Sequence, residues 1–195
     1  MKRAFVFIDG TWLWHNIMQY NLSNPNKIDL GNLPHVLITE FSIQKNIQIE
    51  HIGTILTASV PINVSIEDKS LVDKRYHFFD LLRSKYGFTL DLHEIDFKGR
   101  RLKKSDRLVT DKWSPKEKCV DISMASNLFY YINQYDIAIC ITGDRDFKPA
   151  FDRIKLLDKD LIIASFKQSL SKDLLTNYSC ILIDDLILEN KLTLK

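Results

Sequence analysis

Short apolar runs, separated by longer amphipathic stretches, constrain the fold of this chain more than any other feature. The runs Arg3–Ile8, His51–Leu56, Asp136–Thr142 and Asp160–Phe166 each predict a buried strand. Stretches with helical spacing stand between most of them. Strands that alternate with helices, and that are apolar on both sides, are typical of a parallel sheet. The sequence therefore predicts an α/β fold with a mainly parallel central sheet and helices on both of its faces.

The remaining elements follow from the same spacing. We expect helices over residues 11–19, 33–45, 66–86, 118–133, 147–157 and 170–176, and further strands over residues 88–97 and 180–183. Thr11 is a candidate cap for the first helix, and Gly87 is well placed to end the third. Residues 96–116 are basic and lack apolar periodicity, so they predict an insertion or hairpin that projects from a single domain spanning 1–195.

Length and composition set the broad class of protein. A chain of 195 residues with 45% hydrophobic residues fits one domain with a sizeable core. No segment approaches the roughly 20 apolar residues of a membrane span, and the first apolar run is too short for a signal peptide. The three cysteines, Cys119, Cys140 and Cys180, have neither disulfide nor zinc-ligand spacing. We therefore expect a cytoplasmic protein without a membrane partner; the sequence leaves a homo-oligomer possible.

Four aspartates stand where strands end or helices begin. Asp9 follows the first apolar run, Asp144 and Asp146 follow the run that ends at Thr142, and Asp121 lies at the start of the expected helix over 118–133. In a parallel sheet, strand ends and helix starts share one edge, which is where ligands bind. The four carboxylates are therefore expected to converge on one site.

Converged carboxylates repel one another unless a cation neutralises them. Oxygen ligands without a neighbouring His or Cys favour Mg²⁺ or Mn²⁺ over zinc. Such an ion can activate water for attack on a phosphodiester. Taken one at a time, these aspartates also fit a structural role, because Asp commonly caps helices and occupies turns.

One other class of phosphate chemistry is excluded by a single position. Ile8-Asp9-Gly10-Thr11 is similar to the Asp-x-Asp-Gly-Thr motif of haloacid-dehalogenase phosphatases. The nucleophilic Asp of that motif would fall at Phe7, and phenylalanine cannot form an aspartyl-phosphate. We therefore reject this class.

Three motifs together resemble the NYN domains, a branch of the PIN-like nucleases that includes LabA-like proteins. Phe7-Ile8-Asp9-Gly10 resembles the first-strand motif, and Lys118-Cys119-Val120-Asp121 is similar to the helix-start motif Lys-x-Val-Asp. Thr142-Gly143-Asp144-Arg145-Asp146-Phe147-Lys148-Pro149 resembles Ser-Gly-Asp-x-Asp-Phe-x-Pro, the most specific of the three. The resemblance spans roughly residues 3–165 and leaves the basic segment unaccounted for.

The resemblance implies a PIN-like three-layer sandwich and a Mg²⁺- or Mn²⁺-dependent endoribonuclease. By motif position, Asp9, Asp121, Asp144 and Asp146 would be its catalytic metal ligands. Thr142 stands where Ser is common and would keep a hydroxyl near the ion or its water.

Two positions depart from the family pattern. Trp12 stands where the first motif usually has Asn, and Asn16 is one helical turn further on and would supply an amide instead. Asn127 stands where a further Asp often follows, so it would offer an oxygen ligand without charge. These departures favour the alternative hypothesis, a catalytically weak RNA-binding or regulatory NYN module.

The positive charge of the chain is concentrated in one segment. Residues 96–118 hold nine Lys and Arg against four Asp and Glu, although the net charge of the whole chain is only +2. Because a site lined by carboxylates repels a phosphate backbone, a nuclease needs cations nearby. We expect RNA to contact these basic residues and two that border the motifs: Lys98, Arg100, Arg101, Lys103, Lys104, Arg107, Lys118 and Lys148. Trp113 would either stack on a base or anchor the segment, and a solvated loop is the alternative for the whole run.

Overall fold

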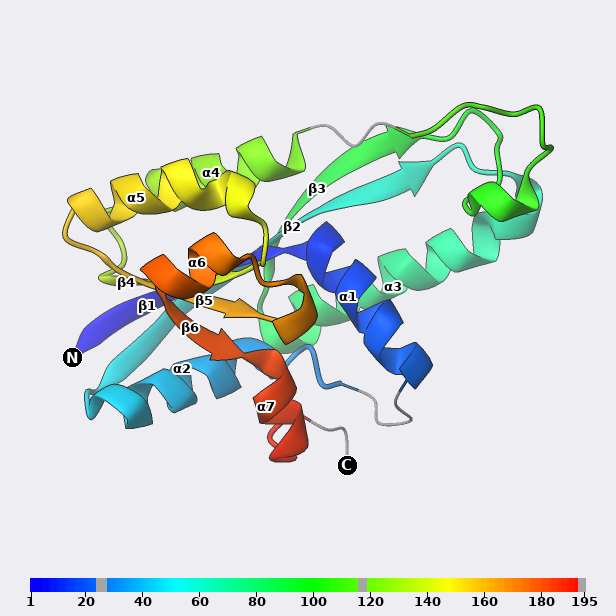
Figure 1. Ribbon diagram of the computed structural model, residues 1–195. Coiled ribbons are helices and arrows are strands. Elements are labelled where there is room, and N and C mark those ends of the chain that lie inside the picture. The colour runs from blue at the N-terminus through cyan, green and yellow to red at the C-terminus, as the bar shows by residue number, and fades with distance from the viewer. Residues whose placement is uncertain (24–27, 116–118, 193–195) are drawn as a thin grey trace.

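The computed structural model describes residues 1–23, 28–115 and 119–192. They form a six-stranded, all-parallel sheet in the order β3-β2-β1-β4-β5-β6, with helices on both faces (Figure 1). The strands are β1 (Lys2–Asp9), β2 (Ile49–Ile62), β3 (Thr89–Asp96), β4 (Ile137–Ile141), β5 (Asp160–Ser165) and β6 (Ser179–Leu182). The α-helices are α1 (Gly10–Ser23), α2 (Leu33–Lys45), α3 (Lys69–Tyr86), α4 (Val120–Tyr130), α5 (Lys148–Leu156), α6 (Lys172–Asn177) and α7 (Ile183–Leu188). The predicted α/β fold, a PIN-like three-layer sandwich, is confirmed.

Each face of the sheet has its own apolar cluster. On β1, Phe5 and Phe7 belong to the cluster under α4 and α5, whereas Val6 and Ile8 belong to the cluster under α1, α2, α3 and α7. This alternation follows from the two-residue period of a strand. Because both faces are covered, the central strands are apolar on both sides, as the sequence analysis expected.

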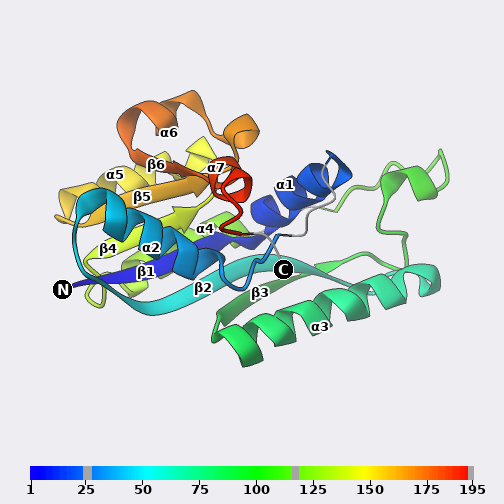
Figure 2. The same cartoon turned by 90° about the horizontal axis from the view of Figure 1, so that it is seen from below.

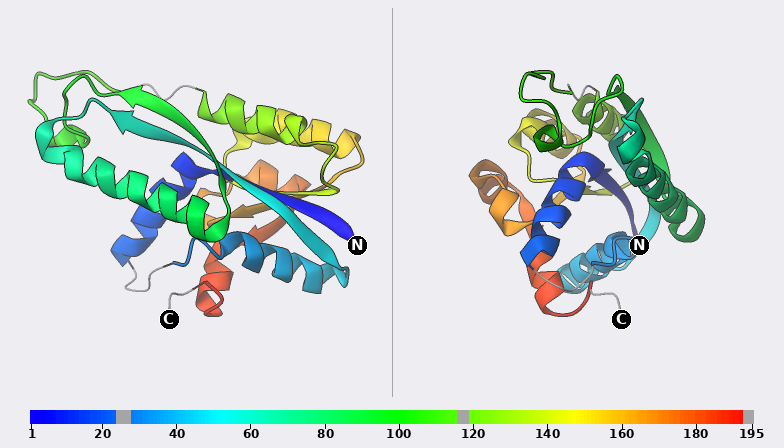
Figure 3. Two further views of the ribbon diagram at one scale, coloured as in Figure 1. Left: turned by 180° about the vertical axis from the view of Figure 1, so that it is seen from behind. Right: turned by 90° about the vertical axis from the view of Figure 1, so that its right-hand side faces the viewer.

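The carboxyl edge of the sheet is uneven because β2 is much longer than β1. Residues 49–57 of β2 pair with β1, and residues 55–62 pair with β3. The ends of β2 and β3 therefore continue beyond β1 as a two-stranded extension, which α3 accompanies (Figure 2). We call this extension, together with the loop 97–115 at its tip, the arm (Figure 3).

The helix ends follow local sequence signals in most places. The expected stop at Gly87 is confirmed: this residue has a φ of 71° and its N–H donates to the carbonyl of Arg83. Pro34 lies in the first turn of α2, where its missing N–H costs nothing. In the described part of the chain, no helix has both the length and the apolar character needed to cross a bilayer.

Two local expectations were wrong. The first helix begins at Gly10, so Thr11 lies inside it and does not cap it. The last strand ends at Leu182, and the next six residues form α7, which the sequence analysis missed. Ile183 and Ile187 pack into the core from this short helix.

Candidate active site

One row of polar side chains crosses the sheet where the apolar strands end. In the strand register Asp9 lies beside Thr57, and Thr57 lies beside Asp91. Thr142 and Ser165 extend the row across the ends of β4 and β5, where the Thr142 N–H still donates to β5. All five side chains except Asp91 are buried. We call these five residues the polar row.

The polar row faces α4 and α5. Two residues apart on one face of β1, Phe5 and Phe7 precede Asp9 and belong to the apolar cluster under these helices. On β4, Cys140 belongs to the same cluster and precedes Thr142 by the same spacing. The apolar core on this side therefore ends in a polar floor at the carboxyl edge of the sheet.

Asp9 is the centre of the row, and both of its carboxylate oxygens accept hydrogen bonds. Its Oδ1 accepts a 3.0 Å hydrogen bond from the N–H of Trp12, which caps the start of α1. Its Oδ2 accepts a hydrogen bond from Thr142 Oγ1 at 3.5 Å. Only 4% of Asp9 is exposed, so this carboxylate is held at the floor of the site. The capping role that the sequence left open is therefore present, and Asp9 also lies at the carboxyl edge of the sheet.

The turn after β4 holds two aspartates through the same kind of contact, in which a side-chain oxygen accepts a main-chain N–H. Thr142 Oγ1 accepts the N–H of Asp144 at 3.2 Å, and Asp144 Oδ1 accepts the N–H of Asp146 at 2.9 Å. Asp144 thereby caps the 3-10 turn that leads into α5. A continuous chain of hydrogen bonds thus links Asp9, Thr142, Asp144 and Asp146 at the carboxyl edge. We call these four residues the aspartate chain.

Gly143 sets the path of this turn. A Cβ at Gly143 would lie 2.1 Å from the carbonyl oxygen of Ser169 and 2.7 Å from Ser165 Oγ. The carbonyl of Gly143 also accepts the N–H of Ser171. The segment after β5 therefore presses directly on the turn, which only glycine accommodates.

Asp121 lies in the exposed first turn of α4. The helix returns from the carboxyl edge to the start of β4, so its first turn lies at the edge that carries the aspartate chain. Val120, Met124 and Leu128 form its buried side. The structure thus places all four predicted aspartates at one edge and links three of them by hydrogen bonds.

The donor atoms at this edge are of the kind that a divalent cation requires. Carboxylate oxygens and a threonine hydroxyl are the ligand types that Mg²⁺ and Mn²⁺ prefer. Among the residues that the structure describes, no three His, Cys, Asp or Glu side chains lie close enough to enclose an ion. The residues therefore fit such an ion in kind, as an open site in which water supplies the remaining ligands.

The two amides singled out from sequence have partners within the protein. Asn16 is buried, and its Nδ2 donates to the carbonyl of Trp12 on the preceding turn of α1. Asn127 Nδ2 donates to Asp91 Oδ2 at 2.8 Å.

Asp91 is the residue of this edge that sequence reasoning missed. Its carboxylate accepts hydrogen bonds from Ser123 Oγ at 2.6 Å and from Asn127 Nδ2. A single Asp in an alternating strand looks like a solvent-facing residue, so nothing local distinguished it. The available signal was on the helix, where Ser123 and Asn127 place two polar groups one turn apart beside the apolar side.

The comparisons with known proteins identify the family of this chain. The family model of the NYN domain matches residues 3–184, essentially the whole chain. The chain belongs to the NYN domain family. Its fold is similar to the crystal structure of a protein of unknown function from Vibrio parahaemolyticus, with a TM-score of 0.55 and 15% identity over 99% of this chain and 96% of the other. A search of curated proteins gives no match.

The arginines of the basic segment in this NYN domain have structural partners. Arg107 donates to three main-chain carbonyls, those of Arg101, Leu102 and Trp113. Arg101 Nε donates to Asp68 Oδ2 at 3.1 Å, and the same oxygen accepts the N–H of Leu102. The guanidinium of Arg101 holds the pKa of the buried Asp68 carboxyl below its usual value. These contacts fold the loop against the start of α3.

Trp113 anchors the loop of the arm. The Arg100 and Arg107 guanidiniums lie 5.0 and 5.2 Å from the centre of its ring, and Phe97 meets the ring edge-on at 5.6 Å. Arg100 also forms an ion pair with Asp111 at 3.0 Å. Of the two roles considered from sequence, these contacts support the packing anchor.

The lysines of the predicted RNA-binding set lie in different surroundings. Lys98, Lys103 and Lys104 are exposed on the loop of the arm. Lys148, at the start of α5, forms a 2.6 Å ion pair with Asp152. Lys118 lies outside the described residues. The three loop lysines are therefore the best placed of the set to meet a phosphate backbone.

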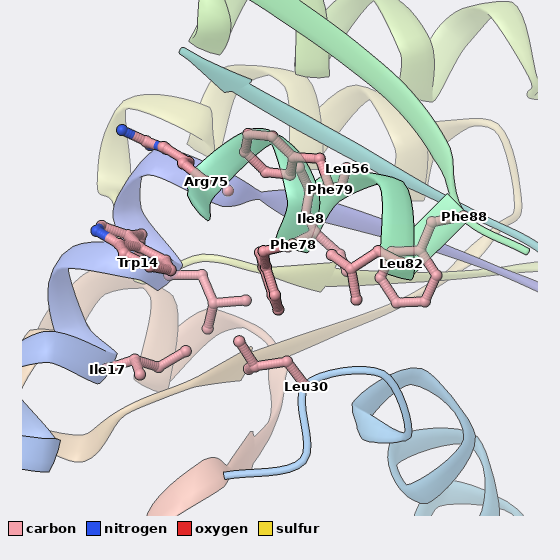
Figure 4. A pocket seen from close by; sticks show the side chains of 12 residues that line it. Ile8, Trp14, Ile17, Leu30, Leu56, Arg75, Phe78, Phe79, Leu82 and Phe88 are labelled. Atoms are coloured by element: carbon pink, nitrogen blue, oxygen red, sulfur yellow. The ribbon is translucent and has the colours of Figure 1, made fainter. Parts of the chain in front are cut away.

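A hollow in this NYN domain lies on the face of the sheet opposite the polar row, between α1 and α3 (Figure 4). Ile8 and Leu56 form its floor, so it is separated from Asp9 and Thr57 by the sheet itself. Its lining is apolar except for Arg75, whose guanidinium lies 5.5 Å from the centre of the Trp14 ring. This lining offers no chemistry for a phosphodiester, so the aspartate edge remains the candidate site.

Proposed function

We propose that this NYN domain is a divalent-metal-dependent endoribonuclease that hydrolyses RNA phosphodiester bonds at the aspartate edge. The observation that carries the proposal is the aspartate chain, in which one threonine hydroxyl links the carboxylate of Asp9, after β1, to the main chain of Asp144, after β4. Membership of the NYN family supports the nuclease class. The sheet edge supports the location, because ligands of parallel sheets bind beyond the strand ends.

Mg²⁺ or Mn²⁺ would be held by Asp9, Asp121, Asp144 and Asp146. When bound, such an ion lowers the pKa of a water ligand and neutralises charge on the phosphate. The protein side chains contribute position. Asp9 and Asp144 each use Oδ1 to cap a helical turn, which restrains the orientation of both carboxylates. The hydroxyl of Thr142 donates to the carboxylate of Asp9 and accepts from the main-chain N–H of Asp144, so it ties the position of the Asp144 main chain to that of the Asp9 side chain.

The strand of RNA would be bound by the arm. A floor of carboxylates repels phosphate, so the affinity must come from cations beyond the floor. Lys98, Lys103 and Lys104 supply exposed positive charge where the arm extends past β1. The arginines would contribute mainly by keeping the loop folded.

The test is a cleavage assay on end-labelled single-stranded RNA with Mn²⁺, Mg²⁺ or EDTA. We expect cleavage with either ion, none in EDTA, and a loss of at least about 100-fold in Asp144→Asn, since this substitution removes a ligand charge but keeps the side-chain shape. Asp80→Asn, an exposed carboxylate on α3, is the matched control and should cleave normally.

Three outcomes would contradict the proposal. RNA binding without cleavage in Mn²⁺ would indicate a binding or regulatory module instead. Normal cleavage by Asp144→Asn would exclude the site. Cleavage of single-stranded DNA in preference to RNA, in a parallel reaction, would contradict the substrate class.

A further inference from the structure

Asp91 lies at the end of the polar row, on the edge strand β3, and it contacts α4 rather than the aspartate chain. We propose that Asp91 is a positioning residue that fastens the first two turns of α4 to the sheet and thereby fixes the position of Asp121. The inference rests on the proposed function for the role of Asp121, but the fastening itself is a property of the protein alone.

The contacts of Asp91 converge on one oxygen. Ser123 Oγ donates to Oδ2 at 2.6 Å, Asn127 Nδ2 donates to Oδ2 at 2.8 Å, and Thr57 Oγ1 donates to it at 3.5 Å. The other oxygen, Oδ1, lies 3.2 Å from His93 Nε2 on the same strand. Ser123 and Asn127 are one turn apart, so a single carboxylate holds two successive turns of the helix.

These hydrogen bonds supply what the apolar contacts of α4 lack. Val120, Met124 and Leu128 bury the helix against the sheet, but apolar burial is non-directional and leaves rotation about the helix axis weakly specified. Hydrogen bonds are directional. On the helical wheel Ser123 lies on one flank of the buried side and Asp121 on the other. A rotation that carried Ser123 away from Asp91 would therefore move Asp121 relative to the aspartate chain.

Asp91 is assigned to positioning rather than to the reacting atoms because Oδ2 is occupied by donors from α4 and β2, and Oδ1 lies beside His93 on its own strand. A carboxylate oxygen has about two acceptor sites, and Oδ2 already receives three side-chain donors. Its influence on the site therefore passes through α4.

The experiment compares Asp91→Ala, Asp91→Asn and Asn127→Ala with the wild type. Asp91→Ala removes the acceptor entirely. Asp91→Asn keeps one oxygen that accepts from both Ser123 and Asn127 when the new NH₂ group takes the place of Oδ1, so this variant rescues the fastening without the charge. Asn127→Ala removes one donor and tests the same contact should Asp91→Ala fold poorly. Glu94→Ala is the control, because Glu94 is exposed on the opposite face of the same strand.

The first readout is amide hydrogen exchange of the metal-free protein. We expect exchange in the first two turns of α4 to rise by at least about tenfold in Asp91→Ala, by less in Asn127→Ala, and little in Asp91→Asn or Glu94→Ala. Exchange in α5 should stay unchanged. If the amides of α4 exchange at the wild-type rate in both Asp91→Ala and Asn127→Ala, the proposal is overturned, whether or not the protein cleaves RNA.

The second readout is the kinetics of RNA cleavage. We expect kcat of Asp91→Ala to fall by about 10- to 100-fold, the cost of a small misplacement of a site group, while KM changes little because the arm holds the RNA. Asp91→Asn should recover most of kcat. A loosened α4 with wild-type kcat would overturn the positioning role. Absence of cleavage by the wild type would refute the proposed function instead, and the exchange data would still decide whether Asp91 fastens α4.

Discussion

Thr142 is the residue on which the geometry of the site most depends. Its buried hydroxyl accepts from the main chain of Asp144 and donates to the side chain of Asp9. One small group thus joins the ends of β1 and β4. A hydroxyl can do this because it is both a donor and an acceptor.

Thr142→Ala should therefore destabilise the fold and weaken the site. Two buried groups lose a partner, which costs about 1–3 kcal/mol in the free energy of unfolding. Thr142→Ser keeps the hydroxyl and should lose much less. Urea unfolding followed by circular dichroism measures both. Equal losses in the two variants would show that the methyl group of Thr142, rather than its hydroxyl, is what matters.

Gly143→Ala tests the turn that carries Asp144. The added Cβ would meet the main chain of Ser169, which cannot move without disturbing the segment after β5. We expect a loss at the upper end of about 1–3 kcal/mol. Gly87→Ala is the comparison: its φ is positive but nothing lies near the new Cβ, so it should cost only about 1 kcal/mol. Thermal unfolding measures both losses. A larger loss of stability in Gly87→Ala than in Gly143→Ala would contradict the packing described for Gly143.

At single positions, the sequence predicted the site only where its signals were local. Asp144 and Asp146 share one short motif, and the motif also includes the threonine that links them to Asp9. The partners of Asp91 lie 32 and 36 residues away, on a different element. Such a contact depends on the register of β3 and the rotation of α4, and neither is encoded within a short window of sequence.

At the scale of elements, the basic side chains of the arm fall into two groups, arginines bound within the protein and lysines exposed to solvent. Arg101 and Arg107 are bound by the carboxylate of Asp68 and by main-chain carbonyls, whereas the lysines remain on the surface. The planar guanidinium suits such fixed multiple contacts, and the flexible lysine suits a phosphate backbone. A charge run in the sequence does not distinguish these groups, because the internal acceptors appear only in the folded loop.

Substituting Lys98, Lys103 and Lys104 together by Ala should weaken RNA binding without unfolding the protein. Each phosphate contact contributes about 0.7 to the slope of log K against log salt for a single strand, so the slope should fall in magnitude by about 2. Fluorescence anisotropy at several salt concentrations measures it. The control replaces Lys45, Lys85 and Lys155, which lie at helix C-termini by the opposite edge of the sheet. Equal slopes for the two triple variants would contradict the arm as the RNA-binding surface.

The attachment of the arm should depend on pH through Asp68. Arg101 keeps the pKa of Asp68 below its usual value, so the ion pair stabilises the folded state above the unfolded pKa of about 3.9. That contribution is lost as the pH falls through the lower, folded pKa. Between about pH 6 and pH 2, the wild type should therefore lose more stability than Asp68→Asn, and their free energies of unfolding should converge. A constant difference across this range would contradict the assigned role of Asp68.

The errors at this scale have clear physical causes. The helix α7 was not predicted because α7 has only six residues, and because the apolar pattern of β6 continues into Ile183 without a break. The cap of α1 was assigned to Thr11 because helix boundaries are fixed by backbone geometry, which a residue pattern locates only to within a turn. The main strands and long helices were predicted correctly because their apolar periodicity is sustained over many residues.

At the scale of the whole molecule, opposite charges lie in adjacent regions. The four aspartates belong to segments at the carboxyl edge of the sheet, and the exposed lysines belong to the loop of the arm. The arm extends past the same edge (Figures 1 and 3). A divalent ion bound to the carboxylates would neutralise their negative charge, so that a phosphate group could approach them. The lysines of the arm would supply affinity for RNA. We therefore expect the proposed catalytic ion to bind at the aspartate edge and at no other region of the protein.

Anomalous diffraction from crystals soaked in Mn²⁺ tests this requirement most directly. If the proposed metal site is correct, at least one Mn²⁺ peak should lie within about 2.5 Å of carboxylate oxygens of Asp9 and Asp144, with water completing the coordination. The same soak of Asp144→Asn crystals should show that peak weakened or absent. Two results would contradict the proposed metal site. One is the absence of Mn²⁺ from the aspartate edge, and the other is ordered Mn²⁺ bound only elsewhere on the protein.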